Sequence, residues 1–293
     1  MTPADIRDRL VAQRVVPVLR LASNGETERA VDCLAEAGFR TFEITLTTPG
    51  AVELIARFNA RNIPYVVFTN GTLRTPAETA QKLRAAGFDV PDHKAMTPSS
   101  VAADFFARKK ISPVLVLGCD AVWQPLVEAG VEIILPKDYR GQAKAIYVGW
   151  YREFTMEDLE RAYDAMSKGA VLYSASNVPF FAASGGRALG TSFAICAMLK
   201  ALTKKEAKIL GKPSSEALKS ASRRLGVPIE QMAIVGDDPL CEIRLARYGN
   251  AVAVGVTTGH NTRAQFEAQK GKFRADLVLD GVEEIGNVLA ALT

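Results

Sequence analysis

Three segments of the chain carry side chains suited to binding phosphate and a metal ion. They are FTNGT at Phe68–Thr72, GKPS at Gly211–Ser214 and VGDDPLCEI at Val235–Ile243. In the first, a hydroxyl and turn N–H groups follow an apolar run, and such groups bind anions. In the second, a lysine just ahead of a helix can neutralise phosphate charge. In the third, carboxylates end an apolar strand and offer the hard oxygen ligands that Mg²⁺ needs beside phosphate.

These residue types together predict a site for phosphoryl transfer. The candidate phosphate-binding residues are Thr69, Asn70, Gly71 and Lys212, and the candidate metal ligands are Asp237, Asp238 and Glu242. Taken alone, the first segment also fits an ordinary Asn-Gly turn, and the lysine fits a solvated helix start. The acidic segment is more specific, because a chain seldom places two acids at the tip of a buried strand for stability alone.

The elements that must position these residues alternate between apolar β-branched runs and stretches of helical period, which predicts parallel βαβ units. Strands are expected at Val15–Leu21, Thr41–Leu46, Pro64–Asn70, Ser112–Gly118, Val131–Leu135, Ala145–Trp150, Met232–Gly236, Ala251–Gly259 and Ala275–Gly281. Helices are expected at Gly25–Gly38, Pro49–Asn62, Thr75–Phe88, Phe154–Gly169, Ser192–Thr203 and Pro213–Leu225, and a Gly-rich turn at Ala183–Gly190. Ligands of open α/β sheets bind at the carboxyl edge, which is where Thr69 and Asp237 would lie.

Composition narrows the class of protein. The 293 residues are 48% hydrophobic, which is enough for a large core in one or two domains. A formal net charge of +4, without basic blocks, gives no case for nucleic acid. No apolar run approaches the ~18 residues of a membrane span. The four cysteines are widely spaced and predict reduced thiols, and a cytoplasmic location is expected.

In their order, the three segments resemble the second, third and fourth motifs of the haloacid dehalogenase (HAD) superfamily of phosphohydrolases. Within it, the chain looks closest to the subclass with a large α/β cap, typified by nitrophenyl phosphatases. On this resemblance, Thr69 matches the hydroxyl of the second motif, Lys212 the lysine of the third and Asp237 the metal ligand of the fourth. Glu242 stands where the family usually has a second Asp. The resemblance implies Mg²⁺ as cofactor and a small phosphorylated substrate, and it leaves a homodimer open.

The implied architecture is an α/β fold: a HAD-like, Rossmann-like parallel-sheet core with an inserted α/β cap domain and an extra N-terminal βα unit. The expected boundaries are residues 1–98 and 186–293 for the core and residues 99–185 for the cap. Trp123, Trp150 and Phe180-Phe181 fall in the expected cap, where most aromatic residues pack in the core and a minority could line a substrate pocket.

The first motif of the family, a strand ending in DxD just ahead of a PGA helix start, is not present. Pro49-Gly50-Ala51 follows FEITLTT instead, which puts Glu43 at the nucleophile position and Thr45 at the general-acid position. A Glu is one methylene longer than an Asp, and a misplacement near 1 Å can cost about 10²-fold in rate. A threonine hydroxyl cannot deliver a proton to the leaving oxygen as a carboxylic acid can.

The first 57 residues have a resemblance of their own, to the N-terminal βαβα of 2-keto-3-deoxy-6-phosphogluconate aldolases, which are TIM barrels. There Glu43 matches the acid/base glutamate, but Thr47 replaces a substrate-binding Arg and the Schiff-base lysine has no counterpart. A chain that joins two partial sites suggests a natural fusion or an engineered chimera. In it, Thr41–Leu46 would take the central slot of the HAD sheet and Val15–Leu21 would be an added edge strand.

Three hypotheses follow from the sequence. The chain is a HAD-type scaffold for Mg²⁺-dependent hydrolysis of a small phosphate ester, with weak or absent turnover. Alternatively, it is a non-catalytic HAD-like binding protein. Aldolase chemistry through Glu43 is the third.

Overall fold

A computed structural model describes residues 64–183, 186–257 and 261–279, together with short pieces at 18–19, 43–44, 56, 59–60 and 62. The expected helix at Gly25–Gly38, and also Thr45, Thr47, His260 and Asp280, lie outside the described residues. The chain divides into two compact units. The first unit contains residues 1–68, 79–95 and 221–293, and the second contains 69–78 and 96–220.

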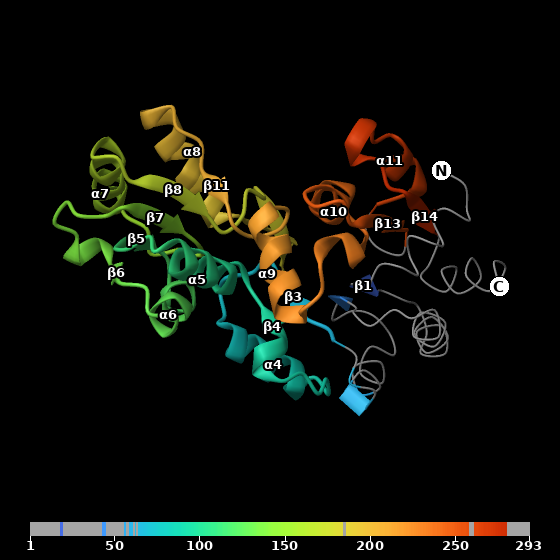
Figure 1. The fold of residues 1–293 in the computed structure, drawn as a ribbon. Helices are drawn as coiled ribbons and strands as arrows, with labels where there is room; N and C mark the ends of the chain where they lie inside the picture. The colour runs from blue at the N-terminus through green and yellow to red at the C-terminus, as the bar shows by residue number, and fades with distance from the viewer. Residues whose placement is uncertain are drawn as a thin grey trace, which may run out of the picture. The chain divides into compact units, whose positions relative to one another are not determined.

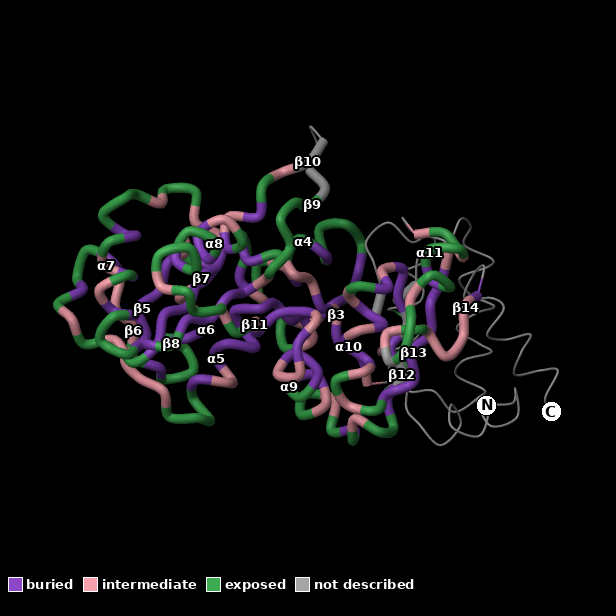
Figure 2. The backbone as a smooth tube through the Cα atoms, turned by 90° about the horizontal axis from the view of Figure 1, so that it is seen from above, coloured by how far each residue is buried: buried purple, intermediate pink, exposed green. Residues whose placement is uncertain are grey.

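The second unit is built on a five-stranded parallel sheet in the order β11-β8-β7-β5-β6. Its strands are β5 (Val114–Leu117), β6 (Ile133–Ile134), β7 (Ala145–Val148), β8 (Val171–Ser174) and β11 (Lys208–Ile209). All residues of β5 and β7 are buried, as expected for a parallel sheet covered on both faces. Figure 2 shows these central strands as buried segments within a more exposed outer layer of helices.

Helices cover the two faces of this sheet (Figure 1). On one side α5 (Pro98–Lys109) packs against α6 (Asp120–Glu128), and on the other α7 (Met156–Ser167) packs against α8 (Thr191–Thr203). Side chains alternate between the faces with a period of two. Tyr147 of β7 meets the ring of Phe106 edge-on on the α5 side, whereas its neighbours Ile146 and Val148 join the core cluster under α7 and α8.

The first turn of α7 contains a capping box, which the sequence indicates by a threonine, Thr155, with an acid three residues later, Asp158. Thr155 Oγ1 accepts from Asp158 N at 3.2 Å, and Asp158 Oδ2 accepts from Thr155 N at 2.9 Å. These two bonds satisfy N–H groups that a helix start leaves without a partner.

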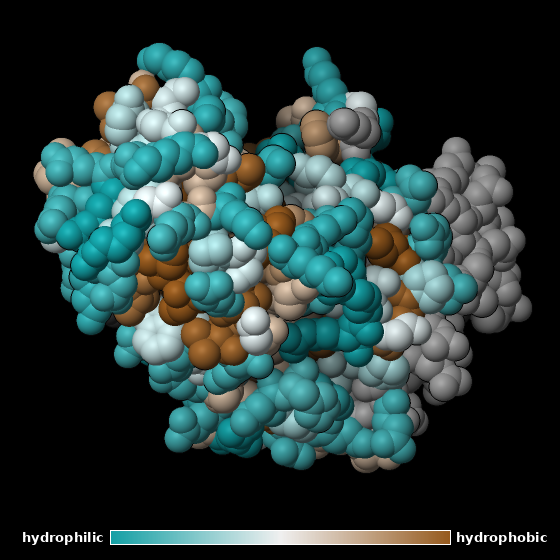
Figure 3. Space-filling model, turned by 60° about the vertical axis from the view of Figure 1, so that its left-hand side comes forward, coloured by the Kyte–Doolittle hydropathy of each residue, from teal (hydrophilic) through white to brown (hydrophobic). Residues whose placement is uncertain are grey.

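A β-hairpin corrects the expected Gly-rich turn. Strand β9 (Phe180–Ala183) pairs with β10 (Gly186–Leu189) in antiparallel register, so half of the Gly-rich segment is strand rather than turn. Gly186 pairs with Ala183 and Leu189 with Phe180, so the two strands align along their full length. Phe180, Phe181 and Leu189 on this hairpin are exposed. The face shown in Figure 3 is mostly hydrophilic, with hydrophobic side chains gathered in separate areas.

The first unit contains three short sheets. Strands β12 (Ala233–Gly236), β13 (Val252–Val256) and β14 (Leu277–Leu279) pair in parallel. Strand β1 (Val18–Leu19) pairs in parallel with β2 (Glu43–Ile44), and β3 (Val67–Phe68) pairs with β4 (Ala95–Met96).

Contacts between these sheets place the Val18–Leu19 strand in the interior. Strand β1 lies against β12, and β2 lies against β3, so the three separately hydrogen-bonded sheets follow one another as β14-β13-β12, then β1-β2, then β3-β4. The expectation that Val15–Leu21 forms an edge strand is therefore wrong. An apolar strand suits an interior position that is covered on both faces, and two parallel strands that follow each other along the chain usually become neighbours.

Short helices complete the described parts of the chain. They are α4 (Pro76–Ala85), α9 (Ser215–Leu225), α10 (Arg244–Arg247) and α11 (Arg263–Glu267), with a π-helical turn at Pro239–Ile243 and single 3₁₀ turns at Asp92–Lys94, Pro136–Asp138, Ile229–Gln231 and Gly271–Phe273. Helix α9 begins at Ser215, two residues after the expected Pro213.

The compact units differ from the expected domain boundaries at the C-terminal end of the cap. Residues 186–220 cluster with the second unit, because β11 pairs with β8 and α8 packs on β7 and β8. The assignment of 99–185 as an inserted cap stays a prediction. No helix among the described residues has the length and apolar character needed to cross a bilayer.

The described cysteines are free thiols, as expected. Cys196 is buried, and Cys119 and Cys241 are half-buried. Burial raises the pKa of Cys196 to about 11 and also raises the pKa of Cys119. Both thiols are therefore protonated near neutral pH and are poor nucleophiles.

A partly buried ion pair in the first unit gives a stability prediction. Arg247 donates to both carboxylate oxygens of Asp276 at 2.7 and 2.9 Å, and Asp276 also accepts from Ala253 N at 2.9 Å. Asp276→Ala should lower the free energy of unfolding by about 2 kcal/mol, because it leaves a partly buried guanidinium without its carboxylate. Urea denaturation followed by circular dichroism measures this change.

The exposed Arg84–Asp92 pair of the same unit provides a matched control. Asp92→Ala should cost at most about 1 kcal/mol, since solvent screens such a pair. Equal effects of the two substitutions would contradict the role assigned to burial.

Candidate active site

The loop after β3 is fixed by hydrogen bonds to the second unit, to which residues 69–78 belong. Thr69 N donates to Met96 O at 3.1 Å, and Thr69 Oγ1 accepts from Gly71 N at 3.2 Å. Thr72 is buried, and its Oγ1 accepts from Trp150 N at 2.9 Å. The loop therefore crosses the carboxyl edge of the five-stranded sheet, where predicted ligand-binding groups belong.

Asn70 joins the first predicted segment to the second. Its amide nitrogen donates to Lys212 O at 2.8 Å, and its amide oxygen accepts from Lys212 N at 2.9 Å. This pair of bonds spans 142 positions of sequence and fixes the backbone of Lys212 on both sides. The structure thus brings together Thr69, Asn70, Gly71 and Lys212 at one sheet edge. Lys212 is 5% exposed.

Gly211 explains why a glycine precedes this lysine. A Cβ on Gly211 would lie 2.2 Å from Ala175 O and 3.1 Å from Asn70 Oδ1, so no larger residue fits without a backbone shift. Gly211 N donates to Ala175 O at 3.1 Å, which continues the pairing of β11 with β8. Close backbone approach, rather than an unusual dihedral angle, makes glycine necessary here.

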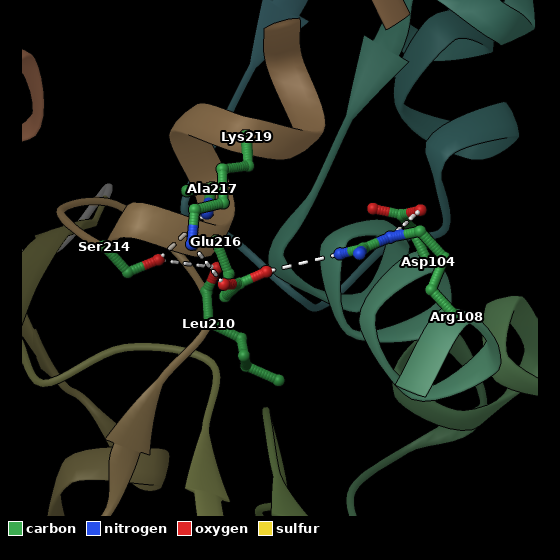
Figure 4. A network of polar contacts seen from close by, with 7 residues as sticks. All are labelled: Asp104, Arg108, Leu210, Ser214, Glu216, Ala217 and Lys219. Carbon is green, nitrogen blue, oxygen red and sulfur yellow. Dashed lines mark hydrogen bonds and ion pairs between the residues drawn. The ribbon is translucent and has the colours of Figure 1, made fainter. Parts of the chain in front are cut away.

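The helix after Lys212 is held by its cap and by an ion pair (Figure 4). Ser214 Oγ accepts from Ala217 N at 3.1 Å and donates to Leu210 O at 3.1 Å, which caps α9. Glu216 in the first turn accepts from Arg108 of α5 at 3.3 Å. The direction of α9 is therefore fixed relative to α5, and the turn that carries Lys212 is fixed with it.

The third predicted segment lies in the first unit, at the end of β12. Asp237 and Glu242 are both buried, at 6% and 7% exposure. A Cβ on Gly236 would come within 2.2 Å of the Glu242 side chain, so this glycine lets the glutamate fold back over the strand end. Asp238 has a structural role, because its Oδ1 accepts from Leu240 N at 2.8 Å and caps the following turn.

Less of the structure is described at the first-motif positions than at the other three segments. Glu43 lies in β2 opposite Val18, and the structure describes its backbone only. Strand β2 is separated from β12 by β1. Among the described residues, no group of three or more His, Cys, Asp or Glu side chains is placed to hold a metal ion.

Four further polar residues lie apart from these segments. Asp276 is used in the ion pair with Arg247. His93 is exposed on a 3₁₀ turn. Lys137 and Asp120 lie at the carboxyl ends of β6 and β5, where both line a surface cavity.

Sequence reasoning missed Thr72, Gly211 and Ser214. Ser214 has a recognisable signal, a serine three residues before a backbone N–H that needs a cap. Thr72 and Gly211 act through contacts with residues far away in sequence, Trp150 and Ala175, so no local pattern marks them.

Two family models match the chain. A model of haloacid dehalogenase-like hydrolases matches residues 44–132, and a HAD-hydrolase-like model matches residues 209–285, together more than half of the chain. Ribonucleotide monophosphatase NagD of Escherichia coli is 26% identical over 246 residues, covering 82% of this chain and 92% of that protein. The 5'-nucleotidase YutF of Bacillus subtilis is 26% identical over 247 residues, covering 83% and 88%.

Solved structures share the fold. A 4-nitrophenylphosphatase from Thermotoga maritima aligns with a TM-score of 0.73 at 20% identity, covering 96% of this chain and 99% of that one. NagD from Escherichia coli gives 0.73 at 20% identity, covering 93% and 97%. With the α/β fold and the motif order, these matches place the chain in the haloacid dehalogenase superfamily of hydrolases, where it is similar to phosphatases such as NagD.

Proposed function

We propose that this chain is a HAD-type phosphohydrolase scaffold that binds a small phosphate ester and turns it over weakly or not at all. The proposal that the chain binds a phosphate ester rests on the pair of hydrogen bonds between Asn70 and Lys212. These bonds join the second and third motifs at one sheet edge. Relatives named ribonucleotide monophosphatase, dihydroxyacetone phosphatase and acid sugar phosphatase support a small substrate. Thr69, Asn70, Gly71 and Lys212 are the proposed phosphate-binding residues.

The proposal that turnover is weak or absent rests on the order of the strands. The nucleophile, the phosphate groups and the metal ligands of a phosphoryl-transfer site must converge within a few ångströms. Here β1 and β2 both lie between β3, which leads to Thr69, and β12, which leads to Asp237. Neighbouring strands lie about 4.8 Å apart, so two intervening strands hold the ends of β3 and β12 roughly 14 Å apart. One intervening strand would leave them roughly 10 Å apart.

Mg²⁺ is the proposed cofactor, and when bound it would neutralise phosphate charge. Asp237 and Glu242, both buried at the end of β12, are the residues that would hold it. Asp238 caps the following turn and is a weaker candidate. The first motif would supply a further carboxylate, and its DxD is not present in the sequence, so the expected affinity for Mg²⁺ is low.

The missing carboxylate is explained if the N-terminal segment has another origin. The match to the HAD hydrolase model begins at residue 44, inside β2, so the preceding residues lie outside it. We infer that this segment, with its resemblance to the aldolase βαβα, replaced the strand that carried the aspartates. Glu43 and Thr45 remain the residues that occupy the first-motif positions by alignment.

The first prediction concerns turnover. With nitrophenyl phosphate and Mg²⁺, the unaltered chain should show a kcat/KM at least about 10²-fold below that of Escherichia coli NagD assayed in parallel, because the reacting groups are misplaced by more than 1 Å. Release of nitrophenolate measures this directly. Comparable activity of the two proteins would contradict the proposed defect.

A second prediction asks which strand neighbours the metal site. Arg20→Asp/Ala22→Asp adds carboxylates just after β1, and Glu43→Asp/Thr45→Asp changes the strand one step further from β12. The first variant should bind Mg²⁺ at least about tenfold more tightly than the unaltered chain, and the second should change little. Isothermal titration calorimetry measures both. The reverse ranking would mean that β2, and not β1, lies beside β12.

A third prediction tests the phosphate-binding half alone. Asn70→Ala removes both bonds to the Lys212 backbone and should weaken binding of inorganic phosphate about 30-fold, given ~1 kcal/mol for each bond. Titration followed by ³¹P NMR measures the affinity. Lys219→Ala removes only an exposed ion pair with Glu216 and is the control. If the two variants bind phosphate equally well, Asn70 does not organise the site.

A further inference from the structure

A cavity of about 640 Å³ opens at the carboxyl ends of β5, β6 and β7 in the second unit. This volume lies within the ~300–1,000 Å³ of typical small-molecule sites. Leu73 and Glu78, which follow the phosphate-binding loop, form part of its wall. The remaining lining residues come from the segments after the three strands. We refer to it as the β5–β7 cavity.

The sheet topology places this cavity at a point where strand connections diverge. Strands β5 and β7 are neighbours, but β5 continues through α6 to β6 on one side and β7 continues through α7 to β8 on the other. Helices α6 and α7 lie on opposite faces of the sheet (Figure 1). Such a switch point opens a crevice outside the carboxyl ends of the strands, and ligands of open α/β sheets bind there.

Two glycines shape this crevice. Gly118 directly follows β5 and Gly149 directly follows β7, and a Cβ on either would come within 2.5 Å of the Val122 side chain. Because neither glycine has a side chain, the first turn of α6 can lie directly over the strand ends. The cavity is lined by Gly118, Cys119 and Ala121 of this turn.

The cavity offers aromatic surface. Trp123 Nε1 donates to Asp120 at 3.2 Å, and Tyr151 OH donates to Asp158 at 3.2 Å. Because the polar atoms of both rings are engaged, the rings present mainly apolar surface to a ligand. Leu135 and Pro136 extend this apolar lining.

The charges of the cavity disfavour an anion. Its carboxylates are Glu78, Asp120, Glu153 and Asp158, against the cations Lys137 and Arg161. Arg161 pairs with Glu157 and Asp158, which neutralises it locally. Carboxylates and the Gln124 amide accept hydrogen bonds from hydroxyl groups. Apolar ring surface beside such acceptors suits a ring that carries hydroxyl groups and no charge.

We propose that the β5–β7 cavity binds a small uncharged polyhydroxylated ring, a sugar either free or within a nucleoside. This site is separate from the predicted phosphate-binding residues and does not depend on turnover. Its carboxylates exclude phosphate, whereas Lys212 and Asn70 lie at the β11 end of the same sheet edge.

The test is a titration of the ¹⁵N-labelled full chain with D-ribose, D-glucose and adenosine, followed by amide chemical shifts. Choline and inorganic phosphate serve as cationic and anionic probes. At least one sugar-containing probe should cause saturable shifts of the Gly118, Cys119 and Ala121 amides. Trp123→Ala should weaken that binding at least about tenfold. Tyr163→Ala, an exposed aromatic on α7 outside the cavity, should leave it unchanged.

The titration of the unaltered chain tests the proposal by itself, so the test does not depend on whether the Trp123→Ala variant folds. Absence of saturable shifts at these amides for all three sugar-containing probes would overturn it. Tighter binding of choline or phosphate at the same amides would overturn the ligand class. If the unaltered chain and a folded Trp123→Ala variant bind the sugar-containing probe with equal affinity, the cavity is not the binding site.

Discussion

The separation of neighbouring strands, about 4.8 Å, is the constraint on which the chemistry of this protein depends. Phosphoryl transfer needs groups from several strand ends within reach of one phosphorus atom. In the first unit, β1 and β2 both lie between β3 and β12. The second-motif loop and the acidic strand end are each well formed. In the proposed function, the order of the strands limits turnover more than the identity of any single residue does.

The parallel sheet of the second unit brings residues that are far apart in sequence together at one edge. Because all five strands run in one direction, the segments that follow β5, β6, β7 and β11 emerge at one edge. Asn70 and Lys212, and also Thr72 and Trp150, meet there despite long separations in sequence. One edge can therefore carry two regions of opposite character, a cationic one after β11 and a carboxylate-rich one after β5 and β7.

Sequence predicted the parts of this fold that depend on local signals. The strands with continuous apolar runs and the Thr155–Asp158 capping box were found because side-chain period and caps act within a few residues. The Gly-rich segment before α8 was misread as a turn, since pairing with Phe180–Ala183 decides its conformation. The position of Val18–Leu19 was misread for the same reason. Asn70 and Lys212 could be proposed from residue type, but the bond between them could not.

Gly211 has a consequence for how variants of this protein are interpreted. Its missing side chain leaves room for the carbonyl of Ala175, and any other residue would collide with that oxygen. A mutational scan scored by function would mark position 211 as essential, as it would a residue that touches substrate. The same scan scored by abundance would give the same result. Intolerance to substitution at position 211 therefore shows that β11 must join its sheet. It would persist in a chain without catalytic activity.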